Sequence, residues 1–221
     1  MQHEFIVGLS YADRLRIATE ARHQALSAYF NSELASLTSL MGPMSDGPEW
    51  PASAAWLAAK HGQHGCIISD GLSDPWVERQ LGDTGLGLEV FIESPDSGIA
   101  HDAPLNTLAD TWLFPMLAEI SHTLASYARL CEKLLADEIL SLEFNIEHIK
   151  DGRGRVGALL QSASTLSLPG GEVKLIAATL LTPAELRFLL GKGAAGRIEL
   201  AAQLQTSGTG QLSLLHRPSL A

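Results

Sequence analysis

The sequence predicts a single α+β domain, with a mixed or antiparallel sheet packed against two long helices. Two observations lead to this prediction. Strand-like segments are dispersed through the middle and C-terminal parts of the chain, and two long segments repeat apolar residues at helical spacing. No linker separates two self-sufficient cores, so we expect residues 1–221 to form one domain.

The first helix is predicted to run from a cap at Ser10 to near Leu40. The apolar residues at helical spacing are Leu15, Ala18, Ala25, Leu26, Tyr29, Phe30, Leu34 and Leu37. Residues 41–51 are rich in Gly and Pro and predict a loop, pinned to the body by Trp50 and Trp56. Residues 52–60 are consistent with either a short helix or an irregular strand.

Two strands are predicted around a polar turn in the middle of the chain. Residues 66–69 are apolar and residues 85–93 alternate, while residues 70–76 between them are dense in Asp, Gly, Ser and Pro. On the second strand, Glu89, Phe91 and Glu93 share one face. Two glutamates around an aromatic residue on one face indicate a recognition surface.

The second long helix is predicted from an apolar stripe that runs from Leu113 to Leu134. Its remaining members are Leu117, Ile120, Leu124, Tyr127 and Cys131. Pro115 fits only the first turn of a helix, which makes Asp110 or Thr111 the expected cap.

The C-terminal third alternates strand and helix signals. Residues 138–149 mix both signals, a turn is expected at 151–154, and strands are expected at 156–162 and 173–181. Thr182, Pro183 and Glu185 form a helix start, and this helix is expected to end at Gly191 or Gly193. A short helix over 194–205 and a tail over 212–218 that pairs as an edge strand complete the prediction.

Two blocks of sequence resemble bacterial suppressor of fused-like domains. One is ISDGLSDPW followed by GLGLEVFIES, over residues 68–94. The other comprises LIAATL, TPAEL, GKG and RPS, over residues 175–219. The resemblance covers residues 60–219 and leaves the helix and Pro-rich loop of residues 1–59 outside it. It implies a protein-binding fold, and in bacteria an immunity protein that neutralises a polymorphic toxin or one delivered by secretion, such as type VI secretion.

The charge of the chain is unevenly distributed. The net charge is −10, and residues 31–127 hold thirteen acidic side chains and two basic ones, a balance of −11. Such a region repels nucleic acid and anionic membranes and steers a basic partner toward itself. Solubility alone is an equally good explanation of this acidity.

Together these features predict that the chain occludes the active site of a cognate toxin or another basic protein. The expected contacts are Asp70, Asp74, Trp76, Glu89, Phe91 and Glu93. For Asp70 and Asp74, the alternative is a purely structural role as Asx-turns, and for Trp76 it is a plug over the core.

The most site-like polar cluster is the segment from His61 to Cys66, which also contains His64. Its spacing matches no standard zinc site, so we expect no metal and no cofactor. The sequence also lacks a nucleophile elbow and a phosphate-binding loop, so we expect no catalytic residues. A small metal-dependent hydrolase that uses the His61/His64 region is the alternative function, and a structural subunit is a third.

Cysteine use and hydropathy predict the compartment. The chain has two cysteines, Cys66 and Cys131, which are too few for a disulfide scaffold at this length. No apolar run reaches the roughly 18 residues of a membrane span, and the N-terminus lacks the features of a secretory signal. We therefore expect a cytoplasmic protein.

Overall fold

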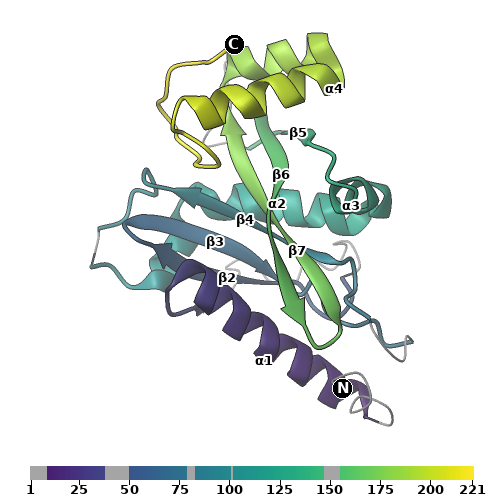
Figure 1. Ribbon diagram of the computed structural model, residues 1–221. Helices are drawn as coiled ribbons and strands as arrows, with labels where there is room; N and C mark the ends of the chain where they lie inside the picture. Colours follow the sequence, from purple (N-terminus) through teal and green to yellow (C-terminus); the bar gives the residue numbers. More distant parts are fainter. Residues whose placement is uncertain (1–8, 38–49, 79–82, 101, 147–154) are drawn as a thin grey trace.

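A seven-stranded mixed sheet forms the centre of the molecule in the computed structural model, which describes residues 9–37, 50–78, 83–100, 102–146 and 155–221 (Figure 1). The strand order is β1-β2-β3-β4-β7-β6-β5. The strands are β1 (Ala35–Leu37), β2 (Ala55–His61), β3 (His64–Asp70), β4 (Leu88–Ser94), β5 (Leu140–Phe144), β6 (Val156–Leu168) and β7 (Gly171–Leu181). The helices are α1 (Tyr11–Phe30), the 3₁₀ helix η2 (Leu105–Asp110), α2 (Leu113–Ser126), α3 (Ala128–Leu135) and α4 (Pro183–Thr206).

All neighbouring strands are antiparallel except β4 and β7, which are parallel and join two antiparallel halves. The α+β class and the mixed sheet are thereby confirmed. The pairing of β4 with β7 stops at Phe91 and Ala177, before either strand ends. Strand β4 is buried on both faces, because all seven of its residues are buried.

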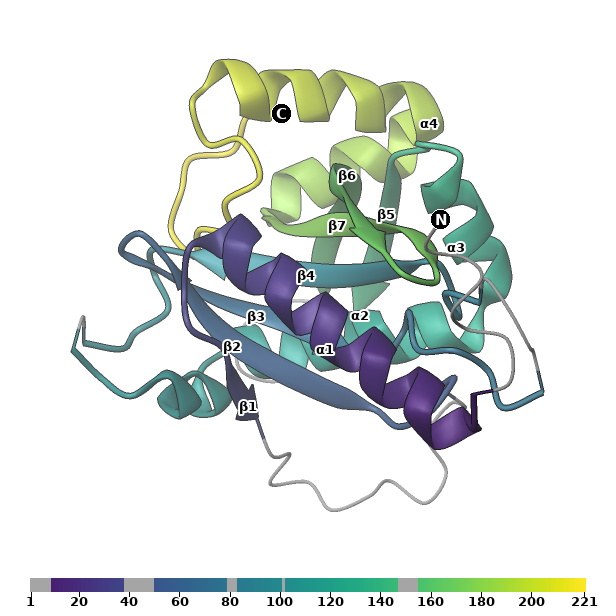
Figure 2. The same ribbon diagram turned by 60° about the horizontal axis from the view of Figure 1, so that its bottom comes forward.

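Helices cover both faces of the sheet (Figures 1 and 2). On one face, Leu26 and Phe30 of α1 pack against Phe91 and its neighbours on β2, β3 and β7. On the other face, α2 and η2 cover the larger core, which includes Leu117 and Leu124. Strand β4 has Leu, Val and Ile on one face and Glu and Phe on the other. Neither face is exposed, because helices cover both sides of the sheet.

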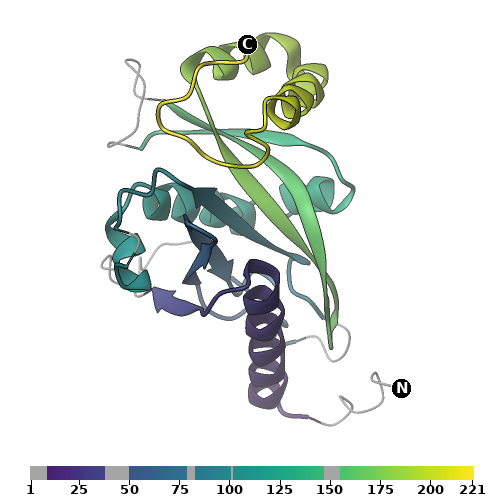
Figure 3. The same ribbon diagram turned by 60° about the vertical axis from the view of Figure 1, so that its left-hand side comes forward.

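Helix α4 forms a third layer at the open end of the β6–β7 hairpin, where β6 begins and β7 ends. Leucines of α4 pack against Leu159 of β6 and Leu181 of β7. Figure 3 shows this long hairpin reaching from α4 toward the N-terminal helix. Helix α4 is interrupted at Gly193, whose φ of 60° is left-handed, so the predicted helix end there and the second helix beyond it are confirmed. The capping box at Thr182 and Glu185 is also confirmed.

The C-terminal tail returns to the sheet and fills the place where β4 and β7 separate. The backbone N–H of Ser213 donates to Glu93 O of β4 at 2.8 Å. Its hydroxyl donates to Ala178 O and accepts from Leu180 N, both on β7. The predicted edge strand over 212–218 does not form, because the tail meets these strands through single residues instead of a ladder.

The predicted helix boundaries were wrong in three places. Helix α1 ends at Phe30, because Asn31 takes a left-handed conformation, and the chain then pairs as β1 with β2. The second long helix breaks at Tyr127 into α2 and α3, and Tyr127 is 63% exposed instead of belonging to the core stripe. Helix α2 is preceded by Trp112, which makes no side-chain capping bond, so neither Asp110 nor Thr111 is the cap.

The open choice for residues 52–60 is resolved as a strand, because most of them form β2. Trp50 and Trp56 are buried and pack edge to face, with ring centroids 5.7 Å apart. Most of the Gly- and Pro-rich loop and the turn predicted at 151–154 lie outside the described residues. Within the described part of the chain, none of the helices combines the length and hydropathy needed to cross a membrane.

Candidate protein-binding groove

Five of the six residues predicted to contact a partner are buried. Asp70, Asp74, Glu89, Phe91 and Glu93 all have exposures of 9% or less, and Trp76 is half-buried. The sequence-based placement of Glu89, Phe91 and Glu93 on an exposed face was wrong, since α1 covers that face of β4. The assignment of the six residues to partner binding stays a prediction.

The acidic turn after β3 is neutralised from within by Arg22 of α1. This arginine is 1% exposed, its Nε donates to Asp70 Oδ1 at 2.7 Å, and its Nη1 donates to Asp74 Oδ1 at 2.6 Å. Glu89 Oε1 lies 3.6 Å from the same guanidinium. His23, one residue along the helix, lies 2.8 Å from Asp70 Oδ2. The cluster therefore fastens α1 to the turn and to β4.

Glu89 also organises the turn through hydrogen bonds. Its carboxylate accepts from the backbone N–H groups of Gly71 and Ser73 and from the hydroxyls of Ser69 and Ser73. Gly71 has a φ of 126°, and a Cβ there would lie 2.8 Å from Ser53 O, so this position requires glycine. The GLSD turn is thus shaped around a buried carboxylate.

The pKa values within this cluster shift in different directions. Burial raises the pKa of Glu89 and of Asp74, and the charge of Arg22 only partly offsets that rise. Burial also acts to raise the pKa of Asp70, but the hydrogen bond from His23 and the charge of Arg22 outweigh it, and that pKa is lowered. Burial acts to lower the pKa of Arg22, yet the three carboxylates raise it overall.

Glu93 contacts both histidines of the His61–Cys66 segment, which the alternative hydrolase function would use. Nδ1 of His61 lies 3.1 Å from one carboxylate oxygen of Glu93, and Nδ1 of His64 lies 2.6 Å from the other. Among the described residues, no group of three or more His, Cys, Asp or Glu side chains is arranged to hold a metal ion. His61 and His64 are accounted for as hydrogen-bonding partners of Glu93, so the geometry gives the hydrolase alternative no support.

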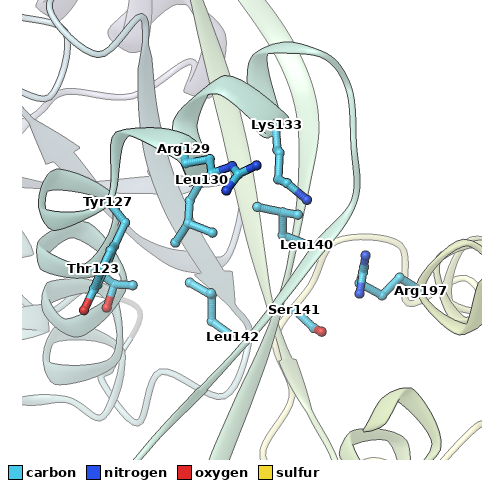
Figure 4. A pocket seen from close by; sticks show the side chains of 9 residues that line it. All are labelled: Thr123, Tyr127, Arg129, Leu130, Lys133, Leu140, Ser141, Leu142 and Arg197. Carbon is cyan, nitrogen blue, oxygen red and sulfur yellow. The ribbon is translucent and has the colours of Figure 1, made fainter. Parts of the chain in front are cut away.

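A groove lies elsewhere, beside the edge strand β5. It encloses about 510 Å³ between the α2–α3 break, β5 and the second half of α4. Leu130 of α3 and Leu140 and Leu142 of β5 supply apolar walls, and the exposed ring of Tyr127 stands at one end (Figure 4). At the break, Tyr127 has non-helical backbone angles, and α3 runs in a different direction from α2 (Figure 2).

The charged side chains that line the groove are all basic. Arg129 and Lys133 lie one turn apart on α3, and Arg197 of α4 faces them across the opening (Figure 4). The Nε of Arg197 donates to Ile139 O at 2.6 Å, directly before β5. This hydrogen bond fixes the guanidinium at the end of the strand.

Strand β5 pairs with β6 on one side, and its other side has no partner strand among the described residues. An edge strand presents N–H and C=O groups that an extended segment of another protein can pair with. An edge beside an apolar groove is therefore suited to protein recognition.

Sequence reasoning missed this groove for identifiable reasons. Residues 138–149 gave mixed signals, and the apolar stripe predicted an unbroken helix through Tyr127. The available signal was Arg129 and Lys133, which share a helix face in an otherwise acidic chain, together with Arg197. Only the tertiary structure brings Arg197 to the same place as the other two.

No family model and no curated protein matches the sequence. Solved structures do match the fold. A crystal structure of the Sufu–Fu complex aligns with a TM-score of 0.55 and 15% identity, over 91% of each chain. Drosophila Suppressor of Fused aligns with a TM-score of 0.53 and 16% identity, over 92% of this chain and 51% of that one.

The chain has the suppressor of fused fold. The alignments cover 91% and 92% of this chain. The suppressor of fused fold does not itself assign a function, because at these identities the shared property is the arrangement of helices and strands.

Proposed function

We propose that the chain is a protein-binding domain that neutralises a partner protein by occupying its surface, and that the partner is a bacterial toxin for which this chain is the immunity protein. The observation that carries the binding proposal is the groove beside the edge of β5 that has no partner strand among the described residues. The fold supports it, since one protein with this fold is seen in a complex with the protein Fu. The toxin as partner follows from the bacterial sequence resemblance.

The proposed mechanism is occlusion without chemistry. Tyr127 is an exposed aromatic anchor, and Leu130 and Leu142 offer apolar surface that a partner would bury. We propose a partner of net positive charge, because the chain carries −10. The charge would accelerate encounter, while contacts in the groove would slow dissociation.

The acidic turn contributes to this function by holding the scaffold in shape. Asp70, Asp74, Glu89 and Glu93 are committed to partners within the chain. Exposed acids elsewhere remain available to attract a basic partner. They include Glu33, Asp96, Asp102, Asp110 and Glu119.

The test is co-expression with the product of the neighbouring reading frame, scored by cell survival and by co-purification. We expect wild type to protect the cells, and Tyr127→Ala to weaken both the protection and the complex. Leu190→Ala is the matched control, because Leu190 is also 63% exposed but lies on α4 outside the groove lining. Full protection by Tyr127→Ala would place the contact on another surface, and no protection by wild type would remove the immunity role.

A further inference from the structure

The lining of the groove changes in chemical character from one end to the other. Figure 4 shows the ring of Tyr127 beside Thr123 at one end. Arg129 and Lys133 of α3 and Arg197 of α4 lie toward the other end, and leucine side chains lie between the two ends. A small molecule that fits this lining has an aromatic or apolar part joined to an anionic part.

The basic end of the groove runs against the charge of the whole chain. The chain has 15 basic and 25 acidic side chains, yet the described residues that line the groove include three basic ones and no acidic one. Lys133 lies 3.5 Å from an oxygen of Glu138, but both side chains are substantially exposed, so this pair is weak. Arg129 is exposed and forms no ion pair with another described residue. Arg197 donates through Nε to Ile139 O, which leaves its Nη groups for a ligand.

Two guanidinium groups and one ammonium group at the same end of the groove favour a phosphate over a carboxylate. A phosphate monoester carries close to two negative charges near neutral pH and has three acceptor oxygens. Planar guanidinium groups bind such oxygens in a two-point hydrogen-bonded geometry, and an ammonium group adds a compact charge. A single carboxylate has one charge and two oxygens, and it would leave part of this donor set unused.

The other end of the groove suits a planar ring. The side chain of Tyr127 is 63% exposed, so a face of its ring is open to stacking with another aromatic group. Leu130 and Leu142 are half-buried beside it and add apolar surface. The enclosed volume of about 510 Å³ lies within the range of about 300–1,000 Å³ that is typical of small-molecule sites. A ring and a phosphate joined by a sugar-sized spacer therefore match the groove in size and chemistry.

We propose that the groove binds a small aromatic phosphate monoester of nucleotide size. Its ring stacks on Tyr127, and its phosphate accepts hydrogen bonds from Arg129, Lys133 and Arg197. A ligand in this position covers Tyr127, which is the anchor of the proposed partner contact, so ligand and partner protein exclude each other. The ligand thereby regulates the binding function, and this regulatory step alone rests on the proposed function.

The probe is adenosine monophosphate, titrated into the full chain at low salt and neutral pH. Adenosine, ribose 5-phosphate and octyl phosphate are the matched comparisons, because they lack the phosphate, lack the ring, and replace the ring by an alkyl chain. We expect adenosine monophosphate to bind at least about tenfold more tightly than each of the three, since each loses either the charge-assisted contacts or the stacking. No binding of adenosine monophosphate, or equal binding of ribose 5-phosphate or octyl phosphate, would overturn the inference.

Two variants test the two ends of the groove separately. Arg129→Gln should reduce the affinity for adenosine monophosphate about tenfold and leave that for adenosine unchanged. Tyr127→Ala should weaken binding of adenosine monophosphate and leave that of ribose 5-phosphate unchanged. Both side chains are exposed, so the melting temperature should stay that of wild type. Arg187→Gln is the control, since Arg187 is exposed on α4 and does not line the groove. Binding that all three variants leave unchanged would place the ligand elsewhere and contradict the inference.

The regulatory step is tested by adding adenosine monophosphate or adenosine to the complex with the product of the neighbouring reading frame. We expect the nucleotide, but not the nucleoside, to release that protein. Retention of the protein by the nucleotide-bound chain would show that ligand and partner do not exclude each other. If the complex forms but adenosine monophosphate does not bind, the ligand inference fails and the binding function stands. If wild type forms no such complex, the proposed function fails, and the titrations still decide the ligand site.

Discussion

At the scale of single residues, Arg22 binds the carboxylates of the acidic turn from inside the fold. Asp70, Asp74 and Glu89 have the spacing of a recognition surface, but Arg22 reaches all three from α1. Three carboxylates around one guanidinium leave an excess of buried negative charge. Burial is the main cause of the raised pKa of Glu89, and the negative charge of Asp70 adds to the rise.

Glu89→Gln is expected to change how stability depends on pH. Burial raises the pKa of Glu89 above its ordinary value of 4.5 in the folded state, so the folded protein binds this proton more tightly than the unfolded chain. The contribution of Glu89 is therefore fully present below its unfolded pKa and is lost as pH rises through the folded pKa. Urea unfolding between pH 4 and pH 8 should show wild type losing stability relative to Glu89→Gln as pH rises. A constant difference across this range would contradict the shifted pKa.

At the scale of elements, the apolar stripe correctly marks the core, although it misplaces the helix. Leu113, Leu117, Leu124 and Cys131 are buried as predicted, even though α2 and α3 are separate helices. Residues of the stripe on both sides of the break stay in one core, and Cys131 Sγ of α3 lies 3.3 Å from Leu124 O of α2. The side chain that leaves the stripe is Tyr127, and it becomes part of the groove.

Leu124→Ala is expected to cost about 2–5 kcal/mol, because the leucine is fully buried and its removal leaves a cavity between α2 and the sheet. Leu190→Ala removes the same atoms from a side chain that is 63% exposed and should change stability by less than about 0.5 kcal/mol. Chemical denaturation of the two variants measures both values. A silent Leu124→Ala would mean that α2 does not seal this face.

At the scale of the whole molecule, the C-terminal tail joins layers that the sheet alone leaves apart. Arg217 forms a two-point ion pair with Glu185 at the start of α4, and both side chains are almost completely buried. Arg217 also donates to Leu180 O of β7, and Leu220 N donates to the same glutamate. With the bonds of Ser213 to β4 and β7, the tail ties α4 to the centre of the sheet.

Arg217→Ala is expected to destabilise the fold by about 3–5 kcal/mol, because it leaves Glu185 charged and buried without its partner. The loss should shrink on acidification. Burial acts to raise the pKa of Glu185, but bonding to Arg217, Thr182 and Leu220 lowers it overall, so this stabilisation is present above the unfolded pKa and lost as pH falls through the folded one. Unfolding of Arg217→Ala and of the exposed control Arg187→Ala at neutral and acid pH measures the difference. Equal stability of the two variants at neutral pH would show that the bond between the tail and α4 does not stabilise the fold.

The sequence by itself determined the fold class, the strands around the acidic turn, the buried stripe and the capping box at Thr182, because each follows from local periodicity or capping chemistry. Only the tertiary structure decided the rest. Whether Glu89 faces solvent depends on α1, which lies far away in the sequence. A strand has the same alternating sequence pattern whether its polar face is exposed or covered by a second layer. The groove likewise requires α3, β5 and α4 to meet, and no local pattern encodes the approach of Arg197 to Arg129.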